Sequence, residues 1–185
     1  MNSDKVVICV LGSDRPGIVA SVSKVLYENR CNIEDVSQTI LQSVFAGVFI
    51  AGIPEEISLE TLHERLQERL APLGLAALVR PVSPQPVYEP PPREPFVVIT
   101  IGPDRVGLVA GITEVMARFG VNITNLRAAF RGGTDPHRNV MIYEVDIPLE
   151  IDQKAFKKAL RDRAEELGLD LSLQHRDIFQ AIHRI

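Results

Sequence analysis

A short polar stretch that occurs twice constrains the fold of this chain more than any other feature. Residues 12–20 read Gly-Ser-Asp-Arg-Pro-Gly-Ile-Val-Ala, and residues 102–110 read Gly-Pro-Asp-Arg-Val-Gly-Leu-Val-Ala. An apolar run precedes each copy, over residues 6–11 and 96–101, and a segment with helical periodicity follows it. The repeated unit is therefore a strand, a tight turn and a helix that starts at the turn, which predicts two domains of one type.

The elements that follow the first turn predict the fold of each domain. A helix over about 17–29 is followed by strands at 33–41 and 44–53, a helix at 59–73 that starts after Ser58 and stops at Gly74, and a strand at 75–82. The order β-α-β-β-α-β is the ferredoxin-like arrangement. The fold class is therefore α+β, with an antiparallel four-stranded sheet in each domain.

The second half repeats this order and adds a tail. Strands are expected at 96–101, 123–130, 140–147 and 169–173, with helices at 108–119 and 151–167 and a longer hairpin loop at 131–138. Ile178, Ile182 and Ile185 indicate a short docking helix. We expect a first domain at 1–82, a proline-rich linker at 83–95 and a second domain with its tail helix at 96–185. The linker is expected to be extended, and a proline-motif ligand for an aromatic groove is the alternative.

Composition excludes several classes of function. The formal net charge is -4, and basic and acidic residues are interspersed, so no basic surface for nucleic acid is expected. No apolar run approaches the roughly 20 residues of a membrane helix, and the N-terminus lacks a secretion signal. Cys9 and Cys31 are expected to be reduced, buried thiols. These features predict a cytoplasmic protein.

No arrangement of residues points to catalysis. The four histidines (His63, His137, His175 and His183) are scattered, and no nucleophile triad or nucleotide-binding loop is present. The Asp135-Pro136-His137 segment could be a metal ligand set or an acid–base pair, although turn-forming residues account for it better. We expect no metal, no cofactor and no enzyme activity.

The two turns are the candidate ligand sites. A helix that starts at such a turn presents free backbone N–H groups, which can hold a small anion such as a carboxylate. Gly17 and Gly107 would allow close approach, and Asn32 and Asn122 would accept a hydrogen bond from an ammonium group. The competing interpretation is that Asp14 and Asp104 cap the helices and that the asparagines satisfy backbone groups.

The apolar first strands also predict an interface. Val6, Ile8 and Val10 alternate with Val7, Cys9 and Leu11, so both faces of the strand are apolar. Because two helices cover only one face of a sheet, the other face is expected to be buried in a homodimer or against the second domain.

The repeated Asp-Arg-x-Gly-(Ile/Leu)-Val-Ala turns, each followed by Asn-Ile, resemble the ACT domain. The two-copy layout resembles the glycine cleavage system transcriptional repressor family, and the turn also resembles the regulatory module of formyltetrahydrofolate deformylases. The resemblance implies effector binding at the first strand–helix turn of each domain. Carried over by position, the implied ligand-binding residues are Asp14, Arg15, Gly17, Ile18, Asn32, Ile33, Asp104, Arg105, Gly107, Leu108, Asn122 and Ile123.

What the resemblance implies about function is a non-catalytic regulatory protein. It would bind a small amino acid, with glycine or serine suspected, and modulate a protein partner in transcriptional regulation of glycine and one-carbon metabolism. Two alternatives stay open, a detached regulatory subunit of an amino-acid or folate-metabolising enzyme and a dimerisation scaffold with vestigial sites. The partner would be a transcription factor for the transcriptional regulator and a metabolic enzyme for the detached regulatory subunit.

Overall fold

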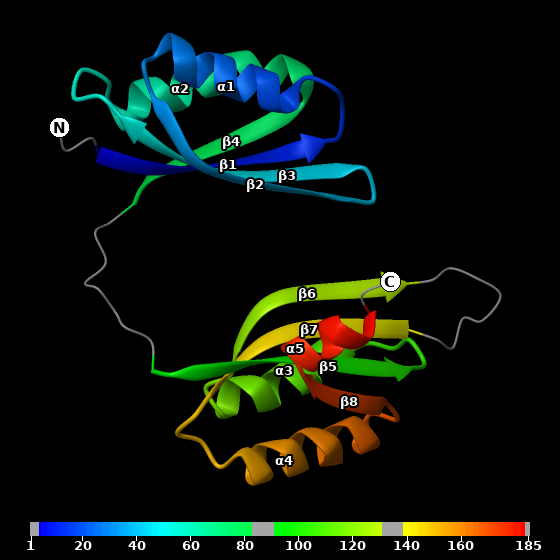
Figure 1. Cartoon of the computed structure of the whole chain (residues 1–185). Coiled ribbons are helices and arrows are strands. Elements are labelled where there is room, and N and C mark those ends of the chain that lie inside the picture. The colour runs from blue at the N-terminus through cyan, green and yellow to red at the C-terminus, as the bar shows by residue number, and fades with distance from the viewer. Residues whose placement is uncertain (1–3, 83–90, 131–138, 184–185) are drawn as a thin grey trace. The chain divides into compact units, whose positions relative to one another are not determined.

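The computed structural model of the chain describes residues 4–82, 91–130 and 139–183, which form two compact units (Figure 1). The units are Met1–Val87 and Tyr88–Ile185. Most of the expected linker, the hairpin loop that contains Asp135-Pro136-His137 and the end of the tail lie outside the described residues.

Each unit contains the expected succession of strands and helices. The first unit consists of β1 (Asp4–Ser13), α1 (Ile18–Glu28), β2 (Asn32–Leu41), β3 (Val44–Ile53), α2 (Leu59–Leu70), the 3-10 helix η1 (Ala71–Leu73) and β4 (Leu75–Pro81). The second consists of β5 (Arg93–Gly102), α3 (Leu108–Arg118), β6 (Asn122–Phe130), β7 (Asn139–Pro148), α4 (Gln153–Glu166), β8 (Asp170–His175) and α5 (Arg176–His183).

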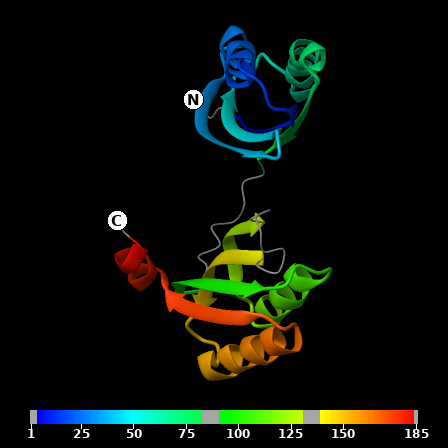
Figure 2. The same ribbon diagram turned by 90° about the vertical axis from the view of Figure 1, so that its right-hand side faces the viewer.

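The strands of each unit form one antiparallel sheet. The strand order is β2-β3-β1-β4 in the first unit and β6-β7-β5-β8 in the second. In each unit the first two helices lie on one face of the sheet (Figures 1 and 2). The predicted α+β class and the ferredoxin-like βαββαβ fold are confirmed.

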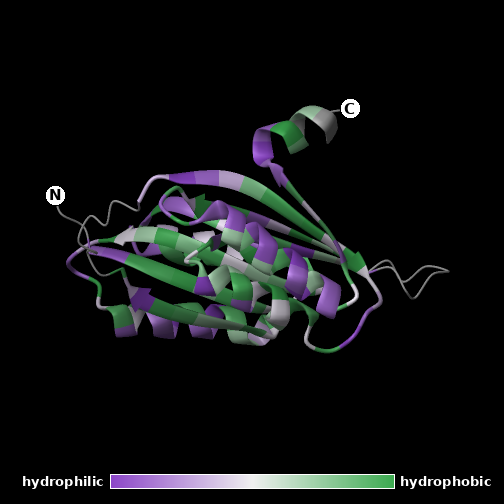
Figure 3. Cartoon of the chain, turned by 90° about the horizontal axis from the view of Figure 1, so that it is seen from below, coloured by the Kyte–Doolittle hydropathy of each residue, from purple (hydrophilic) through white to green (hydrophobic). Residues whose placement is uncertain are grey.

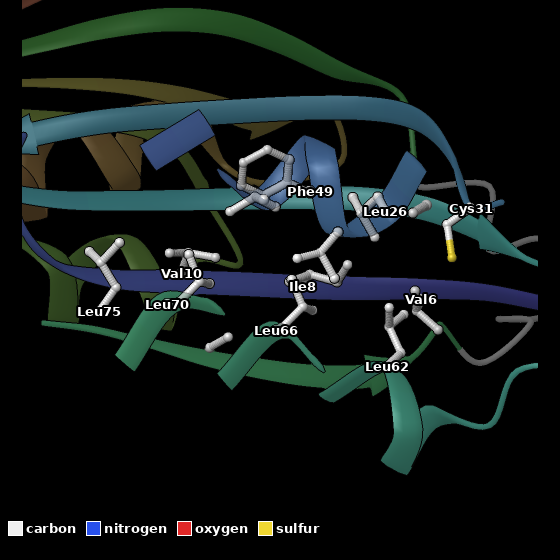
Figure 4. Close-up of a cluster of buried hydrophobic side chains, with 14 of the residues drawn as sticks. Val6, Ile8, Val10, Leu26, Cys31, Phe49, Leu62, Leu66, Leu70 and Leu75 are labelled. Carbon is white, nitrogen blue, oxygen red and sulfur yellow. The ribbon is translucent and has the colours of Figure 1, made fainter. Parts of the chain in front are cut away.

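The core of each unit lies between its sheet and these two helices. In the first unit, leucines of α2 such as Leu66 face β1, and Ile8 and Phe49 are fully buried among them (Figure 4). Burial of one such side chain stabilises the fold by about 1.5–3 kcal/mol. The helices alternate between hydrophilic and hydrophobic residues along the ribbon, as expected for helices that bury one side (Figure 3).

The two cysteines are free thiols in different surroundings. Cys31 belongs to the core of the first unit, whereas Cys9 is half-buried on the opposite face of the sheet. Burial raises the pKa of the Cys31 thiol above its usual 9.0. The prediction of reduced, buried thiols is therefore right for Cys31. Cys9 is a free thiol as predicted, but it is only partly buried.

Strand β5 starts earlier than the apolar run in the sequence indicates. It begins at Arg93 and includes Pro95, residues that the sequence analysis assigns to the linker. Along this part β5 pairs with β7 only, because its pairing with β8 starts at Phe96. An edge position tolerates proline, which has no N–H to donate to a second neighbour.

The tail forms the predicted helix α5, which contacts β5 and β8. It lies on the opposite side of β8 from α4 (Figure 2). Val97 of β5 alternates with the core residues Phe96 and Val98, so its side chain lies on the sheet face away from α3 and α4, yet it is only 3% exposed. We attribute its burial to α5, which covers part of this face.

Candidate ligand-binding turns

The turn between β1 and α1 leaves the helix N-terminus uncapped. Gly17 is the N-cap residue, its φ is 94°, and no side chain accepts a hydrogen bond from the first turn of α1. The first helical bond is the one that Ser21 N donates to the carbonyl of Gly17. The N–H groups of residues 18–20 therefore have no partner within the helix.

The turn between β5 and α3 has the same geometry. Gly107 is the N-cap residue with a φ of 94°, no side chain caps α3, and Gly111 N donates to the carbonyl of Gly107. The interpretation of Asp14 and Asp104 as helix caps is therefore wrong. Each aspartate lies before the N-cap glycine, whose left-handed backbone conformation carries the chain into the helix.

The first turn opens into a small pocket. Its volume is about 210 Å³, and it is lined by Asp14, Arg15, Gly17, Ile18, Val19, Ala20, Gln38 and Phe45. A Cβ built on Gly17 would meet no atom within 4 Å, so there is room beside the turn. The pocket has the size of a small metabolite, and it combines main-chain donors with one apolar wall.

Two lining residues from outside the turn and α1, Phe45 and Gln38, were not predicted, and neither were Val19 and Ala20 of α1. Phe45 is buried and pairs across the sheet with Gly12, while Gln38 comes from the neighbouring strand β2. The repeat gives no signal for either residue, because the matching positions of the second unit hold Asn139 and Ala128. Only the register of the sheet brings them to the turn.

At the second turn, a side chain of the sheet holds the aspartate. The Nδ2 atom of Asn139 donates a hydrogen bond to Asp104 Oδ1 over 3.3 Å. A Cβ on Gly107 would again meet open space, and Val106, which stands where the first turn has Pro16, is fully exposed. Arg105 lies near the next turn of the unit, with its Nη2 atom 3.8 Å from a Cβ built on Gly168.

The Asn-Ile pairs do not lie at the turns. Asn32 pairs with Gly52, which also pairs with Lys5, whereas the turn follows the other end of β1, where Gly12 pairs with Phe45. That separation along the sheet is on the order of 20 Å. The expectation that Asn32 lies beside the first turn of its own unit is wrong, because α1 carries the chain back along β1 before β2 begins.

The same correction applies to the other residues of these pairs. Asn122 shares its partner Asp146 with Pro95, at the far end of β5 from Gly102. Ile33 and Ile123 pack against the hydrophobic cores of their units, which assigns them a packing role.

Each unit also has one larger hollow between its first two helices. One, of about 400 Å³, is lined by α1 and α2 and includes Asn29 and Arg65. The other, of about 660 Å³, is lined by α3 and α4 and includes Arg163 and Glu166. Arg65 donates to Asn29 Oδ1, and Arg163 pairs with Glu166 over 2.8 Å. Arg65 and Arg163 therefore already have polar partners within these hollows.

The described residues contain no group of three or more histidine, cysteine or acidic side chains that could hold a metal ion. Among the same residues, no helix is both long and apolar enough to cross a membrane.

Comparison with known proteins agrees with the tandem architecture. The family model of the ACT domain matches residues 4–79 and again residues 94–174. The chain belongs to the ACT domain family. It contains two ACT domains in tandem, and each lies within one of the two units described above.

Curated relatives of this ACT-domain protein match about one domain. A UPF0237 protein of Methanopyrus kandleri is 44% identical over 77 residues, which cover 41% of this chain and 86% of the relative. A UPF0237 protein of Methanosarcina acetivorans is 38% identical over 91 residues, covering 49% of this chain and 95% of the relative.

Two solved structures match both ACT domains. An unknown protein from Galdieria sulphuraria has a TM-score of 0.76 at 26% identity, covering 94% of this chain and 99% of that one. A candidate glycine cleavage system transcriptional repressor has a TM-score of 0.63 at 20% identity, covering 94% and 98%. At that identity the second likeness shows a shared fold.

Proposed function

We propose that this protein is a non-catalytic regulator that binds a small amino acid at the ACT-domain turns and passes that signal to a protein partner. The observation that carries the proposal is the uncapped start of α1, which opens into a pocket with free space beside Gly17. A fold alone does not imply a function, so the argument rests on the chemistry of this pocket.

The proposed binding mode follows from the charges at the turn. The ligand carboxylate accepts hydrogen bonds from the free N–H groups of residues 18–20, where the helix dipole also favours negative charge. The ammonium group lies beside the Asp14 carboxylate, which lines the same pocket. A carboxylate on one side and N–H donors on the other fit a zwitterion.

The size of the pocket favours small amino acids. A volume of about 210 Å³ that is partly open to solvent suits glycine, alanine or serine better than an aromatic amino acid. Glycine and serine are the amino acids of one-carbon metabolism, and one structural neighbour is a candidate glycine cleavage system repressor. We therefore place this regulator in the transcriptional control of glycine and one-carbon metabolism, in the cytoplasm.

The partner is proposed to be a protein, because the chain carries a net charge of -4 and its basic residues are interspersed with acidic ones, a distribution that does not favour DNA binding. A transcription factor recovered with the tagged full-length chain supports this role. Recovery of an amino-acid or folate-metabolising enzyme would instead favour a detached regulatory subunit.

The binding proposal is tested by calorimetric titration of the full chain with glycine, alanine and serine. Asp14→Ala should weaken binding at the first turn by at least about tenfold, because a charge-assisted hydrogen bond contributes about 1.5–3 kcal/mol when enclosed. Glu28→Ala, at the other end of α1, is the matched control and should leave binding unchanged. Absence of binding to every amino acid at millimolar concentration would contradict the proposal.

A further inference from the structure

The two turns differ at the residues beneath them, although their backbones match. By sheet register, Asn139 of β7 occupies the position that Phe45 of β3 has in the first unit, because they pair with Gly102 and Gly12 respectively. In the same way, Thr100 and Tyr143 take the places of Val10 and Phe49. Three apolar positions of the first core are thus polar in the second: Asn139, Thr100 and Tyr143.

These polar side chains are buried without a full set of partners. Asn139 is 4% exposed and Thr100 is fully buried, yet Asn139 Oδ1 has no hydrogen-bond partner among the described residues. The Tyr143 hydroxyl, 3.3 Å from the sulfur of Met141, donates to that weak acceptor. A buried polar atom without a partner destabilises a fold, so such a cluster needs an explanation.

The unpartnered acceptor of Asn139 belongs to the candidate site. Because Asn139 Nδ2 donates to Asp104 Oδ1, the amide is held directly under the second turn. Its oxygen is buried without a partner, so it is an acceptor that a ligand at this turn would satisfy.

The first turn presents different chemistry at the same place. The Phe45 ring lies over Gly47, since a Cβ on Gly47 would be 2.8 Å from two ring carbons. In the first unit, Gly47 pairs with Val10 and leaves space for the Phe45 ring. The matching residue of the second unit is Met141, which pairs with Thr100 and leaves no such space for an aromatic ring. Gln38 also lines the first pocket, but it is exposed, and water competes for its amide.

We propose that the two turns select different ligands. The first takes a small amino acid whose side chain is absent or apolar, which packs on Phe45. The second takes a small amino acid whose side chain carries a hydroxyl, the serine class, which donates a hydrogen bond to Asn139 Oδ1. This inference rests on the proposed function and adds a specificity to each site.

Alanine and serine are the matched probes, because they differ by a single hydroxyl group. The backbone amides of Gly17 and Gly107 report the two turns separately in nitrogen-15 NMR spectra of the full chain. At Gly107, serine should reach its midpoint at a concentration at least tenfold below that of alanine, because a site with a buried acceptor rejects the analogue that leaves it unpaired. At Gly17 the two midpoints should agree within about threefold.

Asn139→Leu, which removes the amide at similar volume, should abolish the serine preference at Gly107 and leave Gly17 unaffected. Asn125→Leu is the control, since Asn125 bonds to Glu144 on the other face of the same sheet. Circular dichroism checks that both variants fold. If a variant does not fold, the serine and alanine midpoints at Gly107 of the wild type still test the inference.

The outcomes separate this inference from the function on which it rests. If no amino acid moves either glycine amide, the proposed function fails. If both amides respond but serine and alanine have the same midpoint at Gly107, amino-acid binding stands and the inference is overturned. In that case a water molecule donates the hydrogen bond to Asn139 Oδ1. A serine preference that survives in Asn139→Leu would overturn the inference as well.

Discussion

At the residue scale, two glycines of the first turn are required for different reasons. A Cβ on Gly12 would lie 2.6 Å from the carbonyl oxygen of Gly74 and 2.7 Å from Leu75, so the obstacle includes backbone. A Cβ on Gly17 would meet nothing, but its φ of 94° is a conformation that other residues rarely adopt. Glycine is therefore required at position 12 by the lack of space and at position 17 by the backbone conformation.

Gly12→Ala should therefore lower the free energy of unfolding of the first unit by about 1–3 kcal/mol through overpacking. Gly17→Ala should lower it by about 1 kcal/mol through backbone strain. Urea unfolding measures both values. Equal stability of Gly12→Ala and the wild type would show that β1 and β4 separate more easily than the register implies.

At the element scale, the helices that carry caps differ from the helices that could hold a ligand. Ser58 Oγ accepts a hydrogen bond from Thr61 N over 3.1 Å at the start of α2, and Asp152 Oδ1 accepts from Lys154 N and Ala155 N at the start of α4. Helices α1 and α3 have no such side chain. Among these four helices, the uncapped N-termini are therefore the ones at the two turns.

Ser58→Ala should cost about 1 kcal/mol of stability, and Asp152→Ala should cost more, up to about 2 kcal/mol, because it loses two bonds and a favourable charge at the helix dipole. Asp14→Ala is the matched comparison and should cost almost nothing. Thermal unfolding followed by circular dichroism measures all three, and a loss at Asp14 as large as that at Ser58 would restore a capping role to the aspartate.

At the scale of the whole molecule, the first unit leaves one face of its sheet without cover within the unit. Val48 and Leu78 flank Cys9 on the face away from α1 and α2, and their side chains are 43% and 48% exposed. On the matching face of the second unit, Val97 is buried. We propose that a second copy of the chain covers the apolar face of the first unit and forms a homodimer.

Leu78→Glu should reduce the mass measured by light scattering from two chains to one, because the interface would have to bury a charge. Leu149→Glu, an exposed leucine just past the end of β7, is the control and should leave the mass unchanged. A wild-type mass of one chain would contradict the homodimer.

Local patterns in the sequence were enough for much of this fold. The helix start at Ser58 and the helix stop at Gly74 are predicted from residue type and position, because caps and helix ends depend on neighbours in the chain. The early start of β5 at Arg93 could not be predicted, since it depends on which strands pair beside a proline.

The duplicated βαββαβ architecture and the position of the two turns follow from the order of residues, because hydrophobic period, turn residues and an internal repeat are properties of the chain alone. The surroundings of each turn depend on the folded arrangement of the strands. That arrangement removed Asn32 and Asn122 to the far end of the sheet and brought Phe45 and Asn139 under the turns. The physical reason is cross-strand register, which joins residues distant in sequence and therefore sets the chemistry of each site.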